Sequence, residues 1–299
     1  MFKTITRALL PNPLEQILRK AKRKKHTRFL LAWNRGLGDI ALGLYAIVHR
    51  IKEVIPNAEI TFVIRKNLKE GFSLFPEVKT LIAEDWERSK PYNLQKTLQD
   101  LRVSSSSYDV MIAFPNPTYW VKWQRGKLTP KLTWKKEYDA LEKAFSLDEK
   151  YTYIGVQPLA ETHYGHWRNL PEKKWKELFA LAEKRQDLRF LLFGYGSVPS
   201  FSQKNVIDLR GKTSLYSLLS IIKNRCKYLI LPDSGILSMA FYLNESFPIK
   251  VISLWGDPRH GILKQSVASP NPQLEHIPLI GEYKNLDSLT SEKIFSYLN

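Results

Sequence analysis

The chain has 299 residues and a mass of 34.8 kDa, which is long for a single core and suits two domains of about 130–150 residues. Its balance of 43% hydrophobic and 25% charged residues excludes a largely disordered chain. The net charge of +17 is uneven, because residues 1–150 carry 28 basic and 16 acidic side chains and residues 151–299 carry 18 and 13. Such an excess attracts anions, such as nucleic acid, phosphorylated glycans or an anionic lipid surface.

The sequence carries no pattern typical of a membrane span, a secretory signal or a disulfide. One of its longest apolar runs, residues 40–48, stops at nine residues, whereas a span needs about 18–20. The first eleven residues hold only a short apolar stretch. The single cysteine, Cys226, has no partner in the chain and is expected to be a small buried hydrophobe. We therefore expect a soluble protein of a reducing compartment.

Residues 1–27 form a basic segment with a helical apolar stripe. Leu14, Ile17, Leu18 and Ala21 recur at helical spacing beside a face rich in lysine and arginine. One interpretation is a peripheral foot on an anionic membrane. The alternative is a helix that is solvated or packs against the following domain. The basic excess favours the membrane.

From residue 28 onward, apolar runs alternate with helical patterns. The first half has predicted strands at 28–33, 59–64, 76–83 and 108–114 and predicted helices at 40–55 and 94–103. Strands that alternate with helices need crossover connections, which predicts a parallel sheet covered by helices on both faces. This pattern defines a first Rossmann-like domain, residues 28–150.

The same pattern restarts in the second half of the chain. Strands are predicted at 153–157, 189–193, 228–231 and 250–255, and helices at 171–184, at 215–224 and from 235 to 243. Residues 151–299 therefore form a second α/β domain. Ligands of such sheets bind beyond the carboxyl ends of the strands, so two sheets imply a shared cleft.

The turn after the first strand carries the first candidate site. Gly36, Gly38 and Ala41 fit Gly-x-Gly-x-x-Ala, the dinucleotide fingerprint, and Arg65 ends the second strand, where a cation meets a 2′-phosphate in NADP enzymes. Asp39 argues against this reading, because its carboxylate would compete with a pyrophosphate for the same amides. An ionised aspartate at this position suits a general base. The alternative is a helix cap without chemistry.

The corresponding turn in the second half contains Asp233, Ser234 and Gly235. Backbone amides at such a turn bind diphosphates, although a helix cap is the more frequent explanation. Arg168 precedes a helix that starts with a proline, so it is a candidate for neutralising a leaving diphosphate. The alternative is an ordinary surface arginine.

Residues 120–136 interleave cations with aromatic side chains. This composition suits single-stranded nucleic acid as well as sugars and phosphates. Since the chain has no recognisable nucleic-acid motif, we interpret the segment as an acceptor-binding lip, with a solvated loop as the alternative. The two histidines at positions 163 and 166 have no third ligand nearby, so no metal is expected there. The members of the lip are Trp120, Lys122, Trp123, Arg125, Lys127, Lys131, Trp134, Lys135 and Lys136.

Taken together, these pieces resemble glycosyltransferase family 9, the lipopolysaccharide heptosyltransferases, from about Arg28 to the C-terminal region. The resemblance rests on five motifs in order: Arg35-Gly36-Leu37-Gly38-Asp39; Arg168-Asn169-Leu170-Pro171 with Trp175; Gly211-Lys212-Thr213-Ser214-Leu215; Asp233-Ser234-Gly235; and Leu254-Trp255-Gly256-Asp257-Pro258.

The resemblance implies a GT-B fold, with two Rossmann-like domains and an active site in the cleft between them. It implies an inverting reaction without a metal, and the chain has no Asp-x-Asp motif. By the resemblance, Asp39 is the catalytic base that activates the acceptor hydroxyl. The acceptor-binding residues are assigned as Gly38, Arg35, Arg65, Lys122 and Arg125, and the donor-binding residues as Arg168, Asp233, Ser234, Gly235, Ser238, Gly194 and Thr213.

Two departures concern the donor. A histidine of the family is Ser238 here, and an acidic residue that meets the donor ribose has no counterpart between Gly194 and Val206. ADP-heptose is the default donor, with another nucleotide sugar as the alternative.

The expected activity is transfer of a sugar from a nucleotide sugar to a lipopolysaccharide core or related anionic glycolipid. The expected protein is a monomer that lies on the cytoplasmic face of the inner membrane and needs no cofactor beyond the nucleotide-sugar co-substrate. No nucleic-acid partner is expected. The alternatives are an NADP-dependent oxidoreductase and a non-catalytic relative that binds glycans or nucleic acid.

Overall fold

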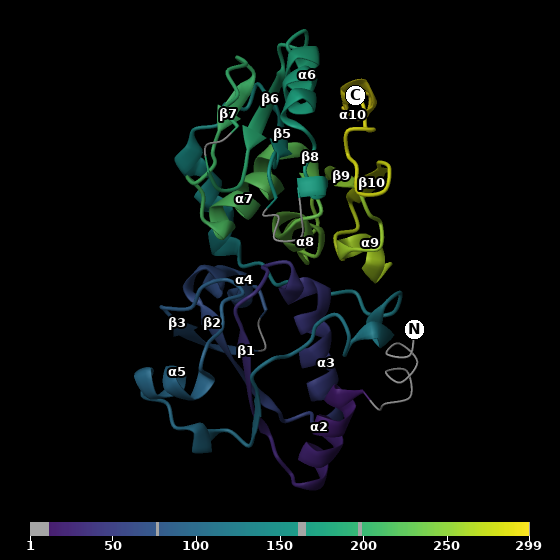
Figure 1. The fold of residues 1–299 in the computed structure, drawn as a ribbon. Helices are drawn as coiled ribbons and strands as arrows, with labels where there is room; N and C mark the ends of the chain where they lie inside the picture. Colours follow the sequence, from purple (N-terminus) through teal and green to yellow (C-terminus); the bar gives the residue numbers. More distant parts are fainter. Residues whose placement is uncertain (1–11, 76–77, 161–165, 197–198, 299) are drawn as a thin grey trace. The chain divides into compact units, whose positions relative to one another are not determined.

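The computed structural model describes residues 12–75, 78–160, 166–196 and 199–298. By contacts between Cα atoms the chain divides into two compact units, residues 1–128 and residues 129–299. Each unit holds its own parallel sheet (Figure 1). The first eleven residues and His163 lie outside the described residues, so the interpretations that concern them stay predictions.

The first unit is built on a four-stranded parallel sheet in the order β3-β2-β1-β4. The central strands β1 and β2 are buried almost throughout, as expected for a sheet that is covered on both faces. All four predicted strands are present, and β1 has the predicted bounds. The strands are β1 (Arg28–Trp33), β2 (Glu59–Arg65), β3 (Lys79–Ala83) and β4 (Val110–Ile112).

The predicted helix at 40–55 is two consecutive helical segments. A π-helical turn, Ile40–Leu44, leads into α3 (Tyr45–Val54). A Cβ atom on Gly43 would lie 2.1 Å from the carbonyl oxygen of Pro117, so glycine allows the loop after β4 to pack directly on this turn. Two further α-helices of the unit are α4 (Lys69–Ser73) and α5 (Leu94–Asp100).

The N-terminal helix α2 (Pro13–Arg23) packs against its own unit. Its apolar stripe is turned inward, with Leu14, Leu18 and Ala21 buried. Glu15 also accepts two hydrogen bonds from Arg50 of α3, at 2.7 and 2.8 Å. The alternative of a domain-packed helix is therefore observed, and the apolar stripe is not a free surface for insertion into a membrane.

The second unit has a six-stranded parallel sheet in the order β10-β9-β8-β5-β6-β7. The core of this unit contains Trp175 and Phe179 of helix α6, which are buried together with Phe190 of β6. Its strands are β5 (Thr152–Val156), β6 (Leu188–Leu192), β7 (Val206–Asp208), β8 (Cys226–Pro232), β9 (Ile249–Trp255) and β10 (Leu274–Ile280). Its α-helices are α6 (Glu172–Ala182), α7 (Leu215–Arg225), α8 (Gly235–Phe241), α9 (Gly261–Gln265) and α10 (Ser291–Phe295).

Residues 129–150 group with the second unit, although the strand pattern places a boundary near residue 150. The 3₁₀ segment Lys136–Phe145 packs on α7. Ser220 of α7 donates to the carbonyl oxygen of Asp139, and Arg225 makes a two-point contact with Glu142. These polar contacts connect the segment to the second sheet's helical layer.

Cys226 is buried as expected, and burial raises the pKa of its thiol. No helix in the described parts of the chain is long and apolar enough to cross a membrane.

Candidate functional site

In the first unit, the turn between β1 and the π-helical segment presents Asp39. Its half-buried side chain makes no capping hydrogen bond, so the alternative of a simple helix cap does not describe it. The carboxylate instead folds back over Gly36, where its Oδ2 lies 2.9 Å from the place that a Cβ atom would take. A pyrophosphate that approached this glycine would meet the carboxylate, which disfavours the dinucleotide interpretation.

Cationic side chains surround this turn. Arg65 ends β2 and donates from Nη2 to the carbonyl oxygen of Arg35 at 2.9 Å. A guanidinium nitrogen of Arg88 lies 3.9 Å from the Cβ position of Gly36. Arg35 is exposed, and Gly38 is buried with its carbonyl oxygen accepting from Leu42. The structure therefore brings together four of the predicted site residues of the first unit: Asp39, Gly38, Arg35 and Arg65.

The predicted acceptor-binding lip is divided between the two units. Gln124, next to the exposed Lys122 and half-buried Arg125, donates to the carbonyl oxygen of Leu42, which places this part beside the turn that follows Asp39. Trp134 belongs to the second unit, where it is buried and donates from Nε1 to Asp139. Its aromatic ring is therefore part of the fold of that unit.

In the second unit, an ion pair forms beyond the end of β8. Arg168 Nη1 lies 3.3 Å from Asp233 Oδ2, and both side chains are largely buried. Burial raises the pKa of Asp233, while the positive charges of Arg168 and His260 act in the opposite direction. Arg168 is thus a buried cation that a carboxylate positions, and the alternative of an ordinary surface arginine does not fit.

Ser234 and Ser238 have structural partners in α8. Ser234 is the N-cap of α8, and its hydroxyl accepts a hydrogen bond from the Leu237 amide at 3.2 Å. This is the helix cap that the sequence analysis gave as the alternative for this turn. Gly235 is the first residue of the helix. The hydroxyl of buried Ser238 donates back to the carbonyl oxygen of Ser234 at 3.1 Å. The donor-binding roles of these residues remain predictions.

The loop after the neighbouring strand β9 contains two residues, Asp257 and His260, that the sequence analysis did not assign to the site. Buried Asp257 accepts from the Arg259 side chain at 2.8 and 2.7 Å, which holds the pKa of its carboxyl well below the usual range. His260 Nε2 lies 3.4 Å from Asp257 Oδ2. Burial lowers the pKa of His260. Asp257 belongs to the family motif Leu254-Trp255-Gly256-Asp257-Pro258, which was the only available signal.

A further polar group ends β5. Gln157 is 7% exposed and donates from Nε2 to the carbonyl oxygen of Leu159 at 3.0 Å. Its Oε1 is buried and accepts no hydrogen bond from the described residues. Gly194, after β6, has φ of +116°, a conformation that favours glycine, and faces the Gln157 side chain. Thr213 is half-buried and precedes Ser214, which caps α7.

These groups share one edge of the second sheet. The strands β9, β8, β5 and β6 are neighbours and all parallel, so their carboxyl ends lie side by side. Asp257, Asp233, Gln157 and Gly194 follow these ends in that order. Such an edge is where ligands bind to open α/β sheets. Within the described residues, no group of three or more His, Cys, Asp and Glu side chains is placed to hold a metal ion.

A scan against models of protein families and a search of curated proteins find no match to this chain. Solved structures do match. Escherichia coli ADP-heptose LPS heptosyltransferase II is 17% identical, over 91% of this chain and 98% of that chain, with a TM-score of 0.66.

Two further solved structures share the fold. A family 9 glycosyl transferase from Veillonella parvula is 17% identical over 90% of this chain and 95% of its own, with a TM-score of 0.60. The E. coli heptosyltransferase WaaC with ADP is 14% identical, over 91% of this chain and 97% of that chain, with a TM-score of 0.51. The resemblance drawn from the motifs is confirmed at the level of the fold: this chain has the two-sheet α/β fold of the family 9 glycosyltransferases.

Proposed function

We propose that the chain is a glycosyltransferase that moves a sugar from a nucleotide diphosphate sugar to a hydroxyl of an anionic glycolipid. The observation that carries the proposal is the buried pair of Arg168 and Asp233 at the carboxyl edge of the second sheet, in a fold shared with heptosyltransferases. A buried guanidinium at this edge suits a diphosphate, because it offers planar, two-point contacts to phosphate oxygens.

In this proposal the second unit binds the donor. Arg168 contacts the diphosphate, and Asp233 is a positioning residue that holds the guanidinium in place. The unpaired Oε1 of Gln157 accepts a hydrogen bond from a hydroxyl or amino group of the nucleoside. This hydrogen bond offsets the free-energy cost of burying the oxygen. Gly194, Thr213, Ser234, Gly235 and Ser238 complete the proposed donor-binding set.

The first unit supplies the base. Asp39 takes the proton of the acceptor hydroxyl as that oxygen forms a bond to the anomeric carbon. The bond from this carbon to the diphosphate oxygen breaks on the opposite face, so the configuration inverts. The electron pair stays on the diphosphate, where Arg168 stabilises the charge. The charge of Arg168 makes a metal unnecessary in this scheme.

The donor is proposed as a specific compound and the acceptor as a class of compounds. ADP-heptose is the proposed donor, because two similar structures carry ADP-heptose or ADP in their names. The proposed acceptor is a lipopolysaccharide core or a related anionic glycolipid. Its support is the cationic surround of Asp39, namely Arg35 and Arg65, together with Lys122 and Arg125 near the following turn.

The same proposal places the protein at the cytoplasmic face of a membrane as a peripheral monomer. Because the apolar stripe of α2 is buried, attachment relies on charge alone. Exposed cations extend from the end of α2 into the following turn: Arg19, Lys20, Lys22, Arg23, Lys24 and Lys25.

A nucleotide panel tests the function. Thermal unfolding is followed with ADP, UDP, GDP, CMP and NADP⁺, and ADP is expected to raise the melting temperature; a ligand at a hundred times its Kd adds about 2.7 kcal/mol. Arg168→Met is expected to abolish the shift. Arg185→Ala is the control, because Arg185 forms an exposed pair with Asp187 before β6, at the opposite edge of the sheet. A response to NADP⁺ alone would overturn the proposal, and a silent panel would favour a non-catalytic relative.

A further inference from the structure

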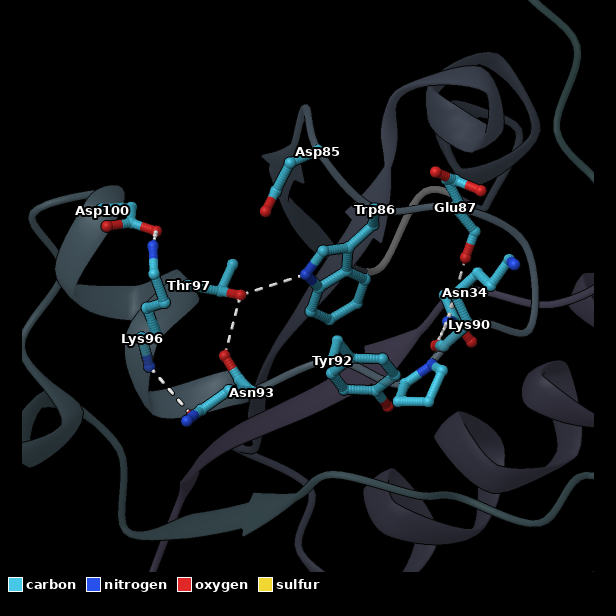
Figure 2. Close-up of a pocket in the computed structure, with 11 residues that line it drawn as sticks. Asn34, Asp85, Trp86, Glu87, Lys90, Tyr92, Asn93, Lys96, Thr97 and Asp100 are labelled. Carbon is cyan, nitrogen blue, oxygen red and sulfur yellow. Dashed lines mark hydrogen bonds and ion pairs between the residues drawn. The ribbon is translucent and has the colours of Figure 1, made fainter.

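A cavity of about 450 Å³ lies at the carboxyl edge of the first sheet, and the proposed function leaves it unassigned. Asn34 follows β1 and Asp85 and Trp86 follow β3, while Thr97 comes from α5 (Figure 2). We name this cavity the Trp86 pocket. Its volume is within the range of about 300–1,000 Å³ that is usual for small-molecule sites. It shares the turn after β1 with Asp39.

Two aromatic residues, Trp86 and Tyr92, line this pocket, and Phe114 continues their row of rings beyond the lining as an aromatic ledge. Trp86 and Tyr92 stack with ring centroids 4.0 Å apart, and Tyr92 lies 5.4 Å from the ring of Phe114. Phe114 follows β4 and is 69% exposed, which is unusual for a large apolar side chain beside a ligand-binding edge. The ledge therefore ends in an aromatic face that no described part of the chain covers.

Two of the three rings, Trp86 and Tyr92, are fixed by hydrogen bonds at their polar ends. Trp86 donates from Nε1 to Thr97 Oγ1 at 3.0 Å, and this hydroxyl donates to the carbonyl oxygen of Asn93 (Figure 2). The Tyr92 hydroxyl donates to the carbonyl oxygen of Ala113. A ligand would thus meet rings that are already ordered, which lowers the entropic cost of binding.

The loop that carries the polar groups is fixed as well. The buried Asn34 amide donates to the carbonyl oxygens of Glu87 and Lys90, at 3.2 and 2.8 Å. The side chains of Asp85, Glu87 and Lys90 are exposed, and the charge of Asp85 acts on Lys96. Lys96 pairs with Asp100 at 2.6 Å. Two carboxylates and one ammonium group therefore line the pocket with side chains that solvent or a ligand can reach.

This combination defines the class of ligand. An aromatic face contacts the C–H face of a pyranose ring, and carboxylates accept its hydroxyl hydrogens. The charges that line the pocket are negative on balance, with three carboxylates (Asp85, Glu87 and Asp100) against two ammonium groups (Lys90 and Lys96), which disfavours a phosphate or a carboxylate. An adjacent cavity of about 360 Å³ shares Trp86 and Glu87 with this pocket, but three cations, Arg65, Lys66 and Arg88, make its lining positive on balance.

We infer that the Trp86 pocket binds an uncharged pyranose unit of the acceptor glycan. The inference rests on the proposed function in one respect, because the word acceptor presupposes glycosyl transfer. The pocket fixes where the glycan lies relative to the turn that carries Asp39, so it contributes to the choice of acceptor.

The test uses the full chain without nucleotide. Saturation-transfer NMR is recorded with methyl glucoside, methyl galactoside and methyl mannoside, and with methyl glucuronide as the anionic counterpart. Saturation of the ring protons of at least one neutral glycoside is expected, with a weaker signal for the glucuronide. Phe114→Ala and Asp85→Asn change exposed residues, and each is expected to weaken binding about three- to tenfold. Leu141→Ala, at an exposed leucine of the second unit, is the control and leaves binding unchanged.

Three results would overturn the inference. They are the absence of a saturation-transfer NMR signal from every neutral glycoside, equal glycoside binding by wild type and Phe114→Ala, and stronger binding of the glucuronide than of the neutral glycosides. The nucleotide panel separates this failure from failure of the proposed function. If ADP binds and no glycoside does, the pocket inference alone fails. If glycosides bind and no nucleotide does, the pocket stands and the transferase proposal fails.

Discussion

Removal of Arg168 should destabilise the fold, because it leaves the carboxylate of Asp233 buried without its cation. The two charged atoms lie 3.3 Å apart, so with an effective dielectric constant of about 20 their attraction is about 5 kcal/mol. Loss of one partner from a buried pair costs about 3–5 kcal/mol. Because both side chains keep a little solvent exposure, we expect Arg168→Met to lower the free energy of unfolding by about 3 kcal/mol at pH 7.

The pH dependence of this variant follows from Asp233. Without Arg168, the pKa of the folded carboxyl rises further above its unfolded value of about 4. Over that interval the folded state holds a proton that the unfolded state has released. The stability of Arg168→Met should therefore fall as pH rises, by up to about 1.4 kcal/mol per pH unit.

Urea unfolding at pH 5 and pH 7 measures both effects. The double variant Arg168→Met, Asp233→Asn removes the unpaired charge and should recover most of the loss. Arg185→Ala, which breaks the exposed pair with Asp187, should change stability by no more than about 0.5 kcal/mol. If Arg168→Met matched wild type to within about 0.5 kcal/mol at pH 7, the reasoning on the buried pair would be refuted.

Three further predictions concern other sites. The His276 ring forms a hydrogen bond with the Ser253 hydroxyl at 2.7 Å, and burial lowers the pKa of the ring to about 4. Because the unfolded chain binds this proton already at about pH 6.5, the free energy of unfolding should fall as pH falls from about 6.5 to 4. The loss is about 1–2 kcal/mol after allowance for solvent around the half-buried ring, and urea unfolding of His276→Gln should show a flatter pH profile. Gln157→Leu removes an unpaired buried oxygen, so calorimetry should show weaker ADP binding with little loss of stability; unchanged affinity would exclude Gln157 from the donor site. Replacing Lys22 and Arg23 with Glu should reduce binding to vesicles that contain anionic phosphatidylglycerol, by about 1 kcal/mol per cation removed, and binding equal to wild type would exclude the basic end of α2 as the contact.

Strand positions were predictable where burial on both faces gives a continuous apolar run. The run at 28–33 matches β1 residue for residue for this reason. The edge strand β10 (Leu274–Ile280) was missed, because it is only partly buried and contains Glu275 and Pro278. The π-helical turn at Ile40–Leu44 was also missed, since five residues are too few for a hydrophobic period to separate it from an α-helix.

The positions of Asp39 and Asp233 at strand-to-helix turns were predictable, because each belongs to a motif between a predicted strand and a predicted helix. His260 was not, because its place near Asp233 depends on β8 and β9 being neighbours in the sheet. The lip at 120–136 shows the limit of composition: its cations and aromatic residues are continuous in sequence, but Trp134 is buried in the second unit.

The central claim is that Asp39 is the base of a glycosyl transfer, and Asp39→Asn tests it most directly. The measurement is the rate of heptose transfer from ADP-heptose to a heptose-deficient lipopolysaccharide core, with ADP affinity measured in parallel. Asparagine keeps the shape that folds back over Gly36. The account predicts a rate about 10²- to 10⁴-fold lower with unchanged ADP affinity, and a wild-type rate in the exposed control Asp148→Asn. Transfer by Asp39→Asn at the wild-type rate would contradict it.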